Sequence, residues 1–309
     1  MECSGLTKKF GTFTAVDSLD LKVRTGEIFG FLGPNGAGKT TTMKMLTTLL
    51  IPTAGRAKVA SFDLHSQAAL IRSRIGIVPQ QFSLFDELTP LENLWYIGEL
   101  YNMKLEEMRA RSEELLKTVQ LYDKRDVPCE GFSGGMKQRL SVAAGLLHTP
   151  KILFMDEPTT GLDPQSRLAL RDLTKQLNTS GITIVYTTHD MEEADKLCDR
   201  IAIIDMGKIM ALGTSKELKD KYGGGHFIEI ETDRHDAELL KELKQLAHAD
   251  SVTARNGTIE LRVKELEGAM VHTLSRFLEK KRIAVKELKM TEPSLESVFI
   301  NLTSKALRD

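Results

Sequence analysis

The sequence is poor in cysteine and has no long apolar run. Its 309 residues include three cysteines, Cys3, Cys129 and Cys198, which lie far apart and leave one thiol over from any pairing. This pattern is typical of structural thiols in a reducing compartment and argues against a disulfide framework. No stretch approaches the roughly 18 apolar residues of a membrane-spanning helix. The N-terminal MECSGLTKKF has the pattern of neither a signal peptide nor a lipidation site. We expect a cytoplasmic protein that works at a membrane only through a partner.

An excess of charge of either sign is also missing. Lys and Arg total 42 and Asp and Glu total 43, so the formal net charge is −1. This balance gives no support for bulk electrostatic binding to nucleic acid or anionic lipid, and no nucleic-acid partner is expected. The hydrophobic share of 41% is that of an ordinary globular protein. Because 309 residues exceed what one hydrophobic core usually serves, two domains are expected.

The stretch GPNGAGKT, residues 33–40, matches the template of a phosphate-binding loop. It lies between an apolar run of strand type, EIFGFL, and TTTMKMLTTLL, which suits the start of a helix. Glycines let backbone N–H groups face phosphate oxygens, Lys39 can reach the β- and γ-phosphates, and Thr40 can ligate Mg²⁺. A glycine-rich turn without a ligand is the alternative for the loop taken alone. The predicted nucleotide-binding residues here are Gly33, Pro34, Asn35, Gly36, Ala37, Gly38, Lys39, Thr40 and Thr41.

Two later segments carry polar groups suited to a bound triphosphate. Ser133, Gly134 and Gly135 open an Ala/Leu-rich helical run, which makes a second anion-binding helix end. The apolar strand KILFM delivers Asp156 and Glu157 at its C-terminal end, where open parallel sheets bind their ligands. Because side chains alternate along a strand, we expect the two carboxylates to point apart. Asp156 then suits Mg²⁺ coordination, and Glu157 suits a base or a water-positioning group.

Three further residues are candidates with open alternatives. A buried or half-buried Gln80, at the end of a strand, could contact Mg²⁺ and the attacking water or cap a turn. His189 ends the strand TIVYTT, where a lone histidine is either structural or a γ-phosphate contact. Phe10 could stack on a base, although a core position is the stronger expectation from the residue alone.

The rest of the chain divides into a helical insert and a separate C-terminal part. Thr89, Pro90 and Glu92 form a helix-start pattern, and residues 106–121 form an amphipathic helix. After the linker at 222–225, the predicted order is β-α-β-β-α-β, a ferredoxin-like α+β unit for which packing or dimerisation is the simplest role. Its predicted elements are strands 227–230, 251–255, 258–263 and 284–290, helices 237–246 and 268–281, a hairpin turn at Asn256-Gly257, and a last helix at 294–302. The predicted domains are 1–222, with a helical subdomain at about 82–147, and 226–309.

In combination and order, these motifs resemble the ATP-binding subunit of an ABC transporter over residues 1–220. The resemblance implies an active ATPase with ATP and Mg²⁺ as cofactors. It also implies an α/β P-loop NTPase core, whose mixed sheet is joined by an antiparallel β-subdomain and a helical subdomain. Phe10 stands where tyrosine is common, which keeps the stacking surface and loses only the hydroxyl. The signature begins with Phe132 and has Met136, where leucine and glutamine are common, and both of these changes spare the serine and glycines that face phosphate. The implied parts are the Walker A loop at 33–40, the Q-loop Gln80, the signature Ser133-Gly134-Gly135-Met136, the Walker B Asp156, the catalytic Glu157, the D-loop Asp163, the switch His189 and the base-stacking Phe10; Thr40, Gln80 and Asp156 are the implied metal ligands.

The family resemblance also implies partners. The signature of one protomer faces the Walker A loop of another, so ATP is bound between two copies of a homodimer. The segments QQFSLFDELT and ELKMTEPSLESVFINLT resemble the daunorubicin/doxorubicin-resistance type of exporter ATPase, which pairs with a separate type-2 permease at the cytoplasmic face of the membrane. The alternative is a soluble ABC ATPase that acts on the ribosome or nucleic acid. Such proteins carry two ATPase domains or a long coiled coil, and the sequence has neither.

Overall fold

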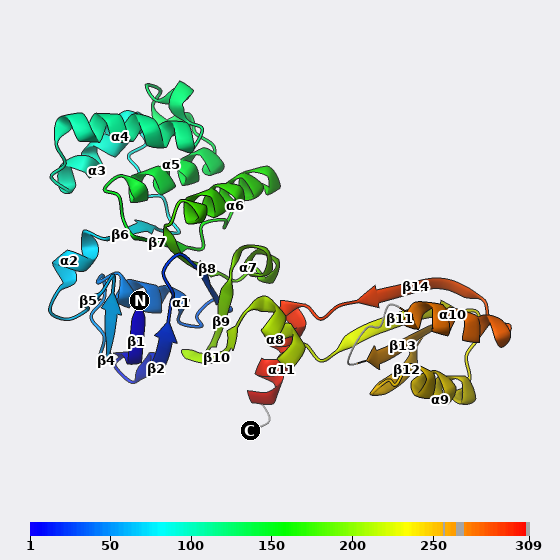
Figure 1. The fold of residues 1–309 in the computed structure, drawn as a ribbon. Coiled ribbons are helices and arrows are strands. Elements are labelled where there is room, and N and C mark those ends of the chain that lie inside the picture. The colour runs from blue at the N-terminus through cyan, green and yellow to red at the C-terminus, as the bar shows by residue number, and fades with distance from the viewer. Residues whose placement is uncertain (256, 264–268, 307–309) are drawn as a thin grey trace. The chain divides into compact units, whose positions relative to one another are not determined.

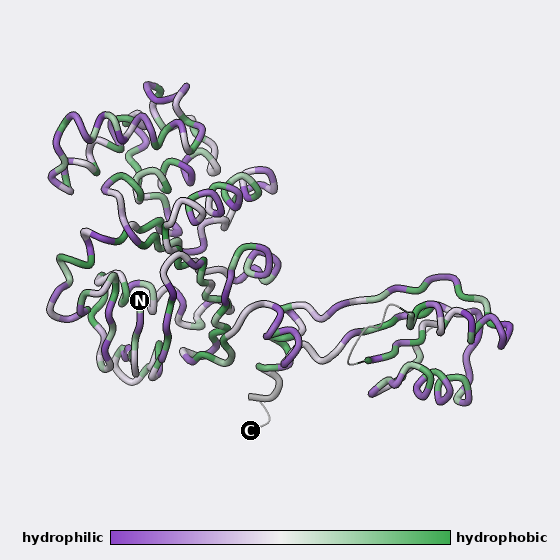
Figure 2. The backbone as a smooth tube through the Cα atoms, in the orientation of Figure 1, coloured by the Kyte–Doolittle hydropathy of each residue, from purple (hydrophilic) through white to green (hydrophobic). Residues whose placement is uncertain are grey.

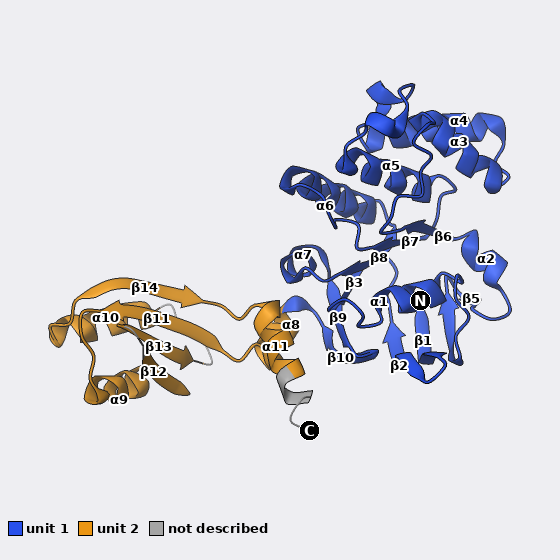
Figure 3. Cartoon of the chain, turned by 180° about the vertical axis from the view of Figure 1, so that it is seen from behind, with its two compact units in different colours: residues 1–215 blue, residues 216–309 orange. Residues whose placement is uncertain are grey.

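The computed structural model describes residues 1–255, 257–263 and 269–306 and divides the chain into two compact units, 1–215 and 216–309 (Figure 3). The core of the first unit is a six-stranded sheet in the order β10-β9-β3-β8-β7-β6, in which only the β9–β10 pair is antiparallel. Every residue of β3, β7 and β8 is buried, as expected for parallel strands covered on both faces. Figure 2 colours the backbone by hydropathy and shows green, hydrophobic stretches in this part of the first unit. The strands are β3 (Ile28–Leu32), β6 (Ile75–Val78), β7 (Ile152–Asp156), β8 (Thr183–Thr188), β9 (Arg200–Asp205) and β10 (Lys208–Gly213).

A second sheet of the first unit is antiparallel and has the order β2-β1-β4-β5. Leu19 and Leu21 of β2 are buried, while Asp20 between them and Lys22 after them are exposed, which is the alternation that the sequence shows. The predicted mixed sheet with an antiparallel β-subdomain is therefore confirmed. The strands are β1 (Glu2–Phe10), β2 (Phe13–Lys22), β4 (Ala54–Val59) and β5 (Phe62–Asp63).

Helices α3, α4 and α5 gather into the helical subdomain at one end of the first unit (Figure 1). The helix-start pattern at Thr89 forms a capping box, because the Thr89 hydroxyl accepts from the Glu92 N–H and the Glu92 carboxylate accepts from the Thr89 N–H. No helix in the described ranges is both long and apolar enough to cross a membrane. The α-helices are α1 (Lys39–Leu46), α2 (Ala68–Arg72), α3 (Pro90–Leu100), α4 (Leu105–Thr118), α5 (Gly134–Leu146), α6 (Pro164–Thr179) and α7 (Met191–Leu197), with 3-10 turns η1 (Tyr122–Lys124) and η2 (Cys129–Gly131).

All three cysteines are buried and free. Burial raises the pKa of the Cys3 thiol to about 12 and that of Cys129 to about 11. Thiols with such pKa values carry almost no thiolate at neutral pH, so they act as small apolar side chains.

The second unit has the ferredoxin-like order, with an antiparallel sheet β12-β13-β11-β14. Ile228 and Ile230 of β11 and Ile259 and Leu261 of β13 pack with Leu243 of α9 in its core. The predicted turn residue Asn256 and the predicted helix start Gly268 lie outside the described residues. The elements are α8 (Ser215–Tyr222), β11 (His226–Thr232), α9 (Ala237–Leu246), β12 (Ser251–Arg255), β13 (Thr258–Val263), α10 (Met270–Lys280), β14 (Val285–Thr291) and α11 (Leu295–Ala306).

The division between the units falls just after Ser215, the first residue of α8, whereas the linker predicted at 222–225 begins at the last residue of that helix. Helix α8 belongs with α11, because the Asn301 Nδ2 donates to the Tyr222 carbonyl at 2.9 Å. Pro293 also packs so closely on Gly223 that a Cβ there would lie 2.4 Å from it. These contacts join two segments that are about 80 residues apart, which local sequence pattern does not reveal.

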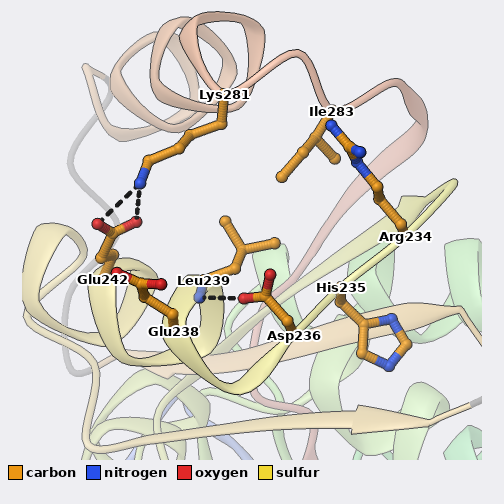
Figure 4. Close-up of a pocket in the computed structure, with 8 residues that line it drawn as sticks. All are labelled: Arg234, His235, Asp236, Glu238, Leu239, Glu242, Lys281 and Ile283. Atoms are coloured by element: carbon orange, nitrogen blue, oxygen red, sulfur yellow. Dashed lines mark hydrogen bonds and ion pairs between the residues drawn. The ribbon is translucent and has the colours of Figure 1, made fainter.

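A surface hollow of about 310 Å³ lies between α9 and the end of α10 in the second unit (Figure 4). Lys281 Nζ reaches across it to both carboxylate oxygens of Glu242, at 2.8 and 2.7 Å. Asp236 caps α9 by accepting from the Leu239 N–H at 2.8 Å. The Lys281–Glu242 pair therefore joins the end of α10 to α9, whereas the Asp236 contact lies within the first turn of α9.

Candidate nucleotide-binding site

The predicted phosphate-binding loop opens onto a cavity of about 460 Å³ between the two sheets of the first unit. The loop runs from the end of β3 to the start of α1, as predicted. Strand residues from the antiparallel sheet form one wall of the cavity, and the loop with α1 forms another. Its lining consists of Phe10, Phe13, Ala15, Asn35, Gly36, Gly38, Lys39, Thr40, Thr41, Gln80 and Glu157.

Two glycines of the loop are required by close backbone packing. A Cβ at Gly33 would lie 2.1 Å from the Ile204 carbonyl oxygen, and one at Gly38 would lie 2.6 Å from the Ala15 carbonyl oxygen. Gly38 also has a φ of 103°, which L side chains rarely adopt. Because Gly38 is the N-cap of α1, no side chain covers the N–H groups of the first helical turn. That helix end is therefore suited to bind an anion.

Lys39 places its ammonium at the centre of the loop. The Nζ atom lies 2.8 Å from the Gly33 carbonyl, 3.1 Å from the Pro34 carbonyl and 3.0 Å from Glu157 Oε1. The side chain is only 4% exposed. The loop and the carboxylate together supply the polar partners that a buried ammonium requires. Next along the loop, Ala37 is buried and donates its N–H to the same Pro34 carbonyl at 3.2 Å.

Asp156 lies at the end of β7 beside the first turn of α1. Its Oδ1 accepts from Thr40 Oγ1 at 3.1 Å and from Thr187 Oγ1 at 2.6 Å. A hydroxyl and a carboxylate oxygen in contact are the hard ligands that Mg²⁺ prefers, and such sites commonly use one or two carboxylates together with substrate phosphates. The residues present therefore fit the predicted metal.

Glu157 lies one residue beyond β7, so the alternation of side chains along a strand does not apply to it and that reasoning was wrong. Its backbone has a φ of 44°, in the left-handed region. The conformation is held by the Glu157 N–H, which donates to the Thr187 carbonyl at 3.1 Å and to Thr187 Oγ1 at 2.9 Å. This backbone turn, rather than strand pleating, separates the Glu157 carboxylate from Asp156.

The Glu157 carboxylate bridges the loop lysine and His189. Oε1 lies 3.0 Å from Lys39 Nζ, and Oε2 lies 3.0 Å from His189 Nδ1. Burial by itself raises the pKa of Glu157, but the hydrogen bonds and charges of Lys39 and His189 outweigh it and lower the pKa below its ordinary value. Glu157 is therefore a buried, ionised carboxylate at neutral pH.

The signature residues and Asp163 lie apart from this cavity. Within the described chain, Ser133, Gly134, Gly135 and Asp163 are not among the residues that line it. Ser133 is the exposed N-cap of α5, and Asp163 is the exposed N-cap of α6. A Cβ at Gly135 would lie 2.2 Å from Ser166 Oγ, so α5 packs directly on α6. One copy of the chain therefore presents two separate helix N-termini at the segments predicted to bind phosphate.

Three details of the cavity differ from the sequence analysis. Gln80 lines it but is exposed rather than buried or half-buried. Phe10 is 51% exposed and lines the cavity, so the expectation of a core position was wrong. Phe13, which is 63% exposed, lines the same cavity and was missed. The signal was its place three residues after Phe10, across the hairpin turn that begins at Gly11.

A glycine-rich loop between a buried parallel strand and a helix, with a lysine and a carboxylate in contact, defines a P-loop nucleotide-hydrolysing protein. The family model described as ABC transporter matches residues 16–160, and that of the ATP-binding protein DrrA1-3-like C-terminal domain matches residues 213–303. The chain belongs to the ABC transporter ATP-binding proteins. It is an ATPase of that family with a DrrA-like C-terminal domain, which confirms the prediction over the ribosome or nucleic-acid alternative.

Individual relatives match over the full chain. The linearmycin resistance ATP-binding protein LnrL of Bacillus subtilis (strain 168) is 38% identical over 310 residues, covering 100% of both chains. The daunorubicin/doxorubicin resistance ATP-binding protein DrrA of Streptomyces peucetius is 39% identical over 314 residues, covering 100% of this chain and 94% of the relative. Among solved structures, a dimeric ATP-binding cassette in a post-hydrolysis state bound to ADP and Pi is 31% identical. It has a TM-score of 0.62 over 69% of this chain and 97% of that one. The predicted P-loop NTPase core is thereby confirmed.

Proposed function

We propose that this chain is the ATP-hydrolysing subunit of an exporter and that it drives a separate membrane permease from the cytoplasmic face. The observation that carries the proposal is the arrangement of Glu157 between Lys39 and His189, next to the contact of Thr40 with Asp156. The relatives named for linearmycin and daunorubicin resistance support an exporter.

Lys39 and Glu157 are proposed to exchange partners when ATP binds. Without nucleotide, the Lys39 ammonium is bound to two loop carbonyls and to Glu157. A γ-phosphate at the loop offers more negative charge than one carboxylate, so it takes over the ammonium and frees Glu157 Oε1. Glu157 can then accept a proton from the attacking water, while His189 holds Oε2 in place.

The remaining cavity residues fit the metal and the base. Thr40, Asp156 and Gln80 would hold Mg²⁺, which neutralises charge on the β- and γ-phosphates when it is bound. Phe10 and Phe13 offer two exposed rings for stacking on the nucleobase. We therefore assign both rings to the base-binding end of the cavity.

We further propose that ATP closes a homodimer in which the signature of one copy binds the nucleotide held by the other. Shifting an open pair from 1:99 to 99:1 closed requires about 5.5 kcal/mol. Ser133 and the Gly135 N–H, at two sites, offer charge-assisted hydrogen bonds of about 1.5–3 kcal/mol each, which is sufficient. Hydrolysis removes the γ-phosphate and these contacts, so the dimer opens.

Ser133→Arg, made in Glu157→Gln protein, is expected to abolish the ATP-dependent dimer while ATP still binds. The arginine side chain fills the space that the signature leaves for phosphate. Sedimentation with and without Mg-ATP measures the dimer, and Ser180→Arg, near the C-terminal end of α6, is the matched control. An ATP-dependent dimer that survives Ser133→Arg contradicts the proposed interface.

An apolar surface suited to a permease segment follows Gln80. Phe82, Phe85, Tyr96 and Tyr101 are 40–46% exposed, and the Phe85 and Tyr96 rings meet edge to face at 4.9 Å. A hollow of about 130 Å³ between this segment, α3 and α5 lies under it. Exposed aromatic residues beside a hollow are typical of a protein-binding surface. We propose that the permease docks here.

Co-purification tests the partner. Tagged Glu157→Gln protein, isolated from native membranes with Mg-ATP, is expected to bring a multi-span membrane protein with it. The double variant Phe85→Ser and Tyr96→Ser, made in the same background, should lose that protein while it retains ATP. Recovery of ribosomes or nucleic acid without a membrane protein would contradict the exporter proposal.

A further inference from the structure

Glu193 is a buried carboxylate with an unusual set of partners. It lies near the start of α7, is 6% exposed and accepts hydrogen bonds from three hydroxyl groups. Tyr186 Oη donates to Oε1 at 2.7 Å, and Thr159 Oγ1 and Thr188 Oγ1 both donate to Oε2 at 2.9 Å. In the described ranges no lysine, arginine or histidine forms an ion pair with it.

The two threonines flank the proposed catalytic pair. Thr159 is two residues beyond Glu157, in a turn that the Thr160 N–H closes on the Glu157 carbonyl at 3.2 Å. Thr188 directly precedes His189. The single oxygen Oε2 of Glu193 therefore ties together two segments that the sequence places about 30 residues apart.

The same network fixes the backbone beyond His189. The Asp190 N–H donates to Thr188 Oγ1 at 2.9 Å, and the Glu193 N–H donates to Asp190 Oδ1 at 3.0 Å. His189 thus lies between two residues that are both anchored to Glu193. Its own side chain is half exposed and bonds only to Glu157 Oε2 among the contacts that the structure describes.

Burying a carboxylate costs desolvation free energy that an apolar side chain does not require. A leucine would occupy a similar volume without desolvating a charge. What the carboxylate adds is direction, because its lone pairs fix the positions of three hydroxyl groups at once. The Glu157 turn needs such support, since its left-handed φ of 44° is unfavourable for a non-glycine residue.

We propose that Glu193 is a positioning residue for ATP hydrolysis. By holding Thr159 and Thr188 on one oxygen, it sets the separation of the Glu157 and His189 segments at which the 3.0 Å contact between these residues forms. The inference rests on the roles proposed above for Glu157 and His189. Misplacing either group lowers the rate of the chemical step without removing a contact to nucleotide.

Paired variants test the inference by separating kcat from KM. Thr159→Val and Thr188→Val each remove one hydroxyl on Oε2 with almost no change of volume, and each is expected to lower kcat about tenfold or more with KM for ATP within about twofold of the parent. Tyr186→Phe is the matched control. It removes a hydroxyl from the same carboxylate within β8, away from both loops, and should retain the parent kcat.

The carboxylate itself is tested by Glu193→Gln and Glu193→Ala. The glutamine carbonyl can still accept from both threonines, so Glu193→Gln should keep kcat within about threefold of the parent, whereas Glu193→Ala should lose at least as much as either threonine variant. If Glu193→Ala does not fold, the two valine variants and Tyr186→Phe are sufficient to test the inference. The inference is overturned if both valine variants keep the parent kcat, or if their KM for ATP rises as their kcat falls. It is also overturned if the kcat of Tyr186→Phe falls as far as the kcat of the valine variants. Parent-like turnover by Glu157→Gln would instead overturn the proposed function.

Discussion

Glu157→Gln protein should bind ATP as tightly as the parent and lose hydrolysis by about 10²- to 10⁴-fold in kcat, the range over which a general base contributes. The amide cannot accept a proton from water, but it has nearly the shape of the carboxylate and can still lie between Lys39 and His189. Phosphate release under single-turnover conditions measures the chemical step, and calorimetric titration with ATP measures binding.

Because hydrolysis opens the proposed dimer, the same variant should accumulate as an ATP-bound dimer. Glu192→Gln is the matched control, since Glu192 is an exposed carboxylate on α7, 75% accessible and paired only with Lys196 among its described contacts. We expect it to retain the parent kcat. A Glu157→Gln protein that turns over ATP at the parent rate would exclude Glu157 as the base.

Lys39→Ala is expected to weaken ATP binding by about 100-fold or more. One charge-assisted hydrogen bond contributes about 1.5–3 kcal/mol, and a lysine ammonium can donate two to the phosphates. Binding of a fluorescent ATP analogue measures the loss. Lys44→Ala, an exposed lysine in the last turn of α1, is the control and should bind as the parent does. Unchanged affinity in Lys39→Ala would contradict the loop assignment.

Removing Lys39 also changes the pH dependence of stability. In the parent, the depressed pKa of Glu157 contributes stability above the ordinary glutamate pKa, and this contribution is lost as the pH falls through the folded-state pKa. Without Lys39 that contribution shrinks. The difference in melting temperature between parent and Lys39→Ala should therefore be largest at neutral pH and smaller in acid, as thermal scans without nucleotide can test.

Local signals in the sequence were enough to predict the phosphate-binding loop and most of the helices and strands. The spacing from Gly33 to Thr40 fixes a phosphate-binding loop because few other structures require two glycines followed by lysine and threonine. The ferredoxin-like order of the second unit followed from alternating apolar residues and short turns. Such patterns are local, so they can be recognised without knowledge of the tertiary contacts.

Other features depended on contacts between distant segments. Phe10 lines the nucleotide cavity only because the β1–β2 hairpin lies beside the loop, and α8 joins the second unit only because it contacts α11. The position of the Glu157 carboxylate depended on a left-handed turn held by Thr187. The predicted roles of the site residues remain predictions for the variants above.

The sequence by itself therefore determined the family, the P-loop core and the set of groups that can contact phosphate, because these depend on residue type and spacing. Only the tertiary structure decided which of those groups meet. Thr40 reaches Asp156 across 116 residues of chain, and Lys39 reaches Glu157 from the same helix end. The network around Glu193 likewise exists only where three segments converge. The physical reason is that a hydrogen bond depends on distance and direction in space, which the packing of strands and helices sets and chain spacing does not.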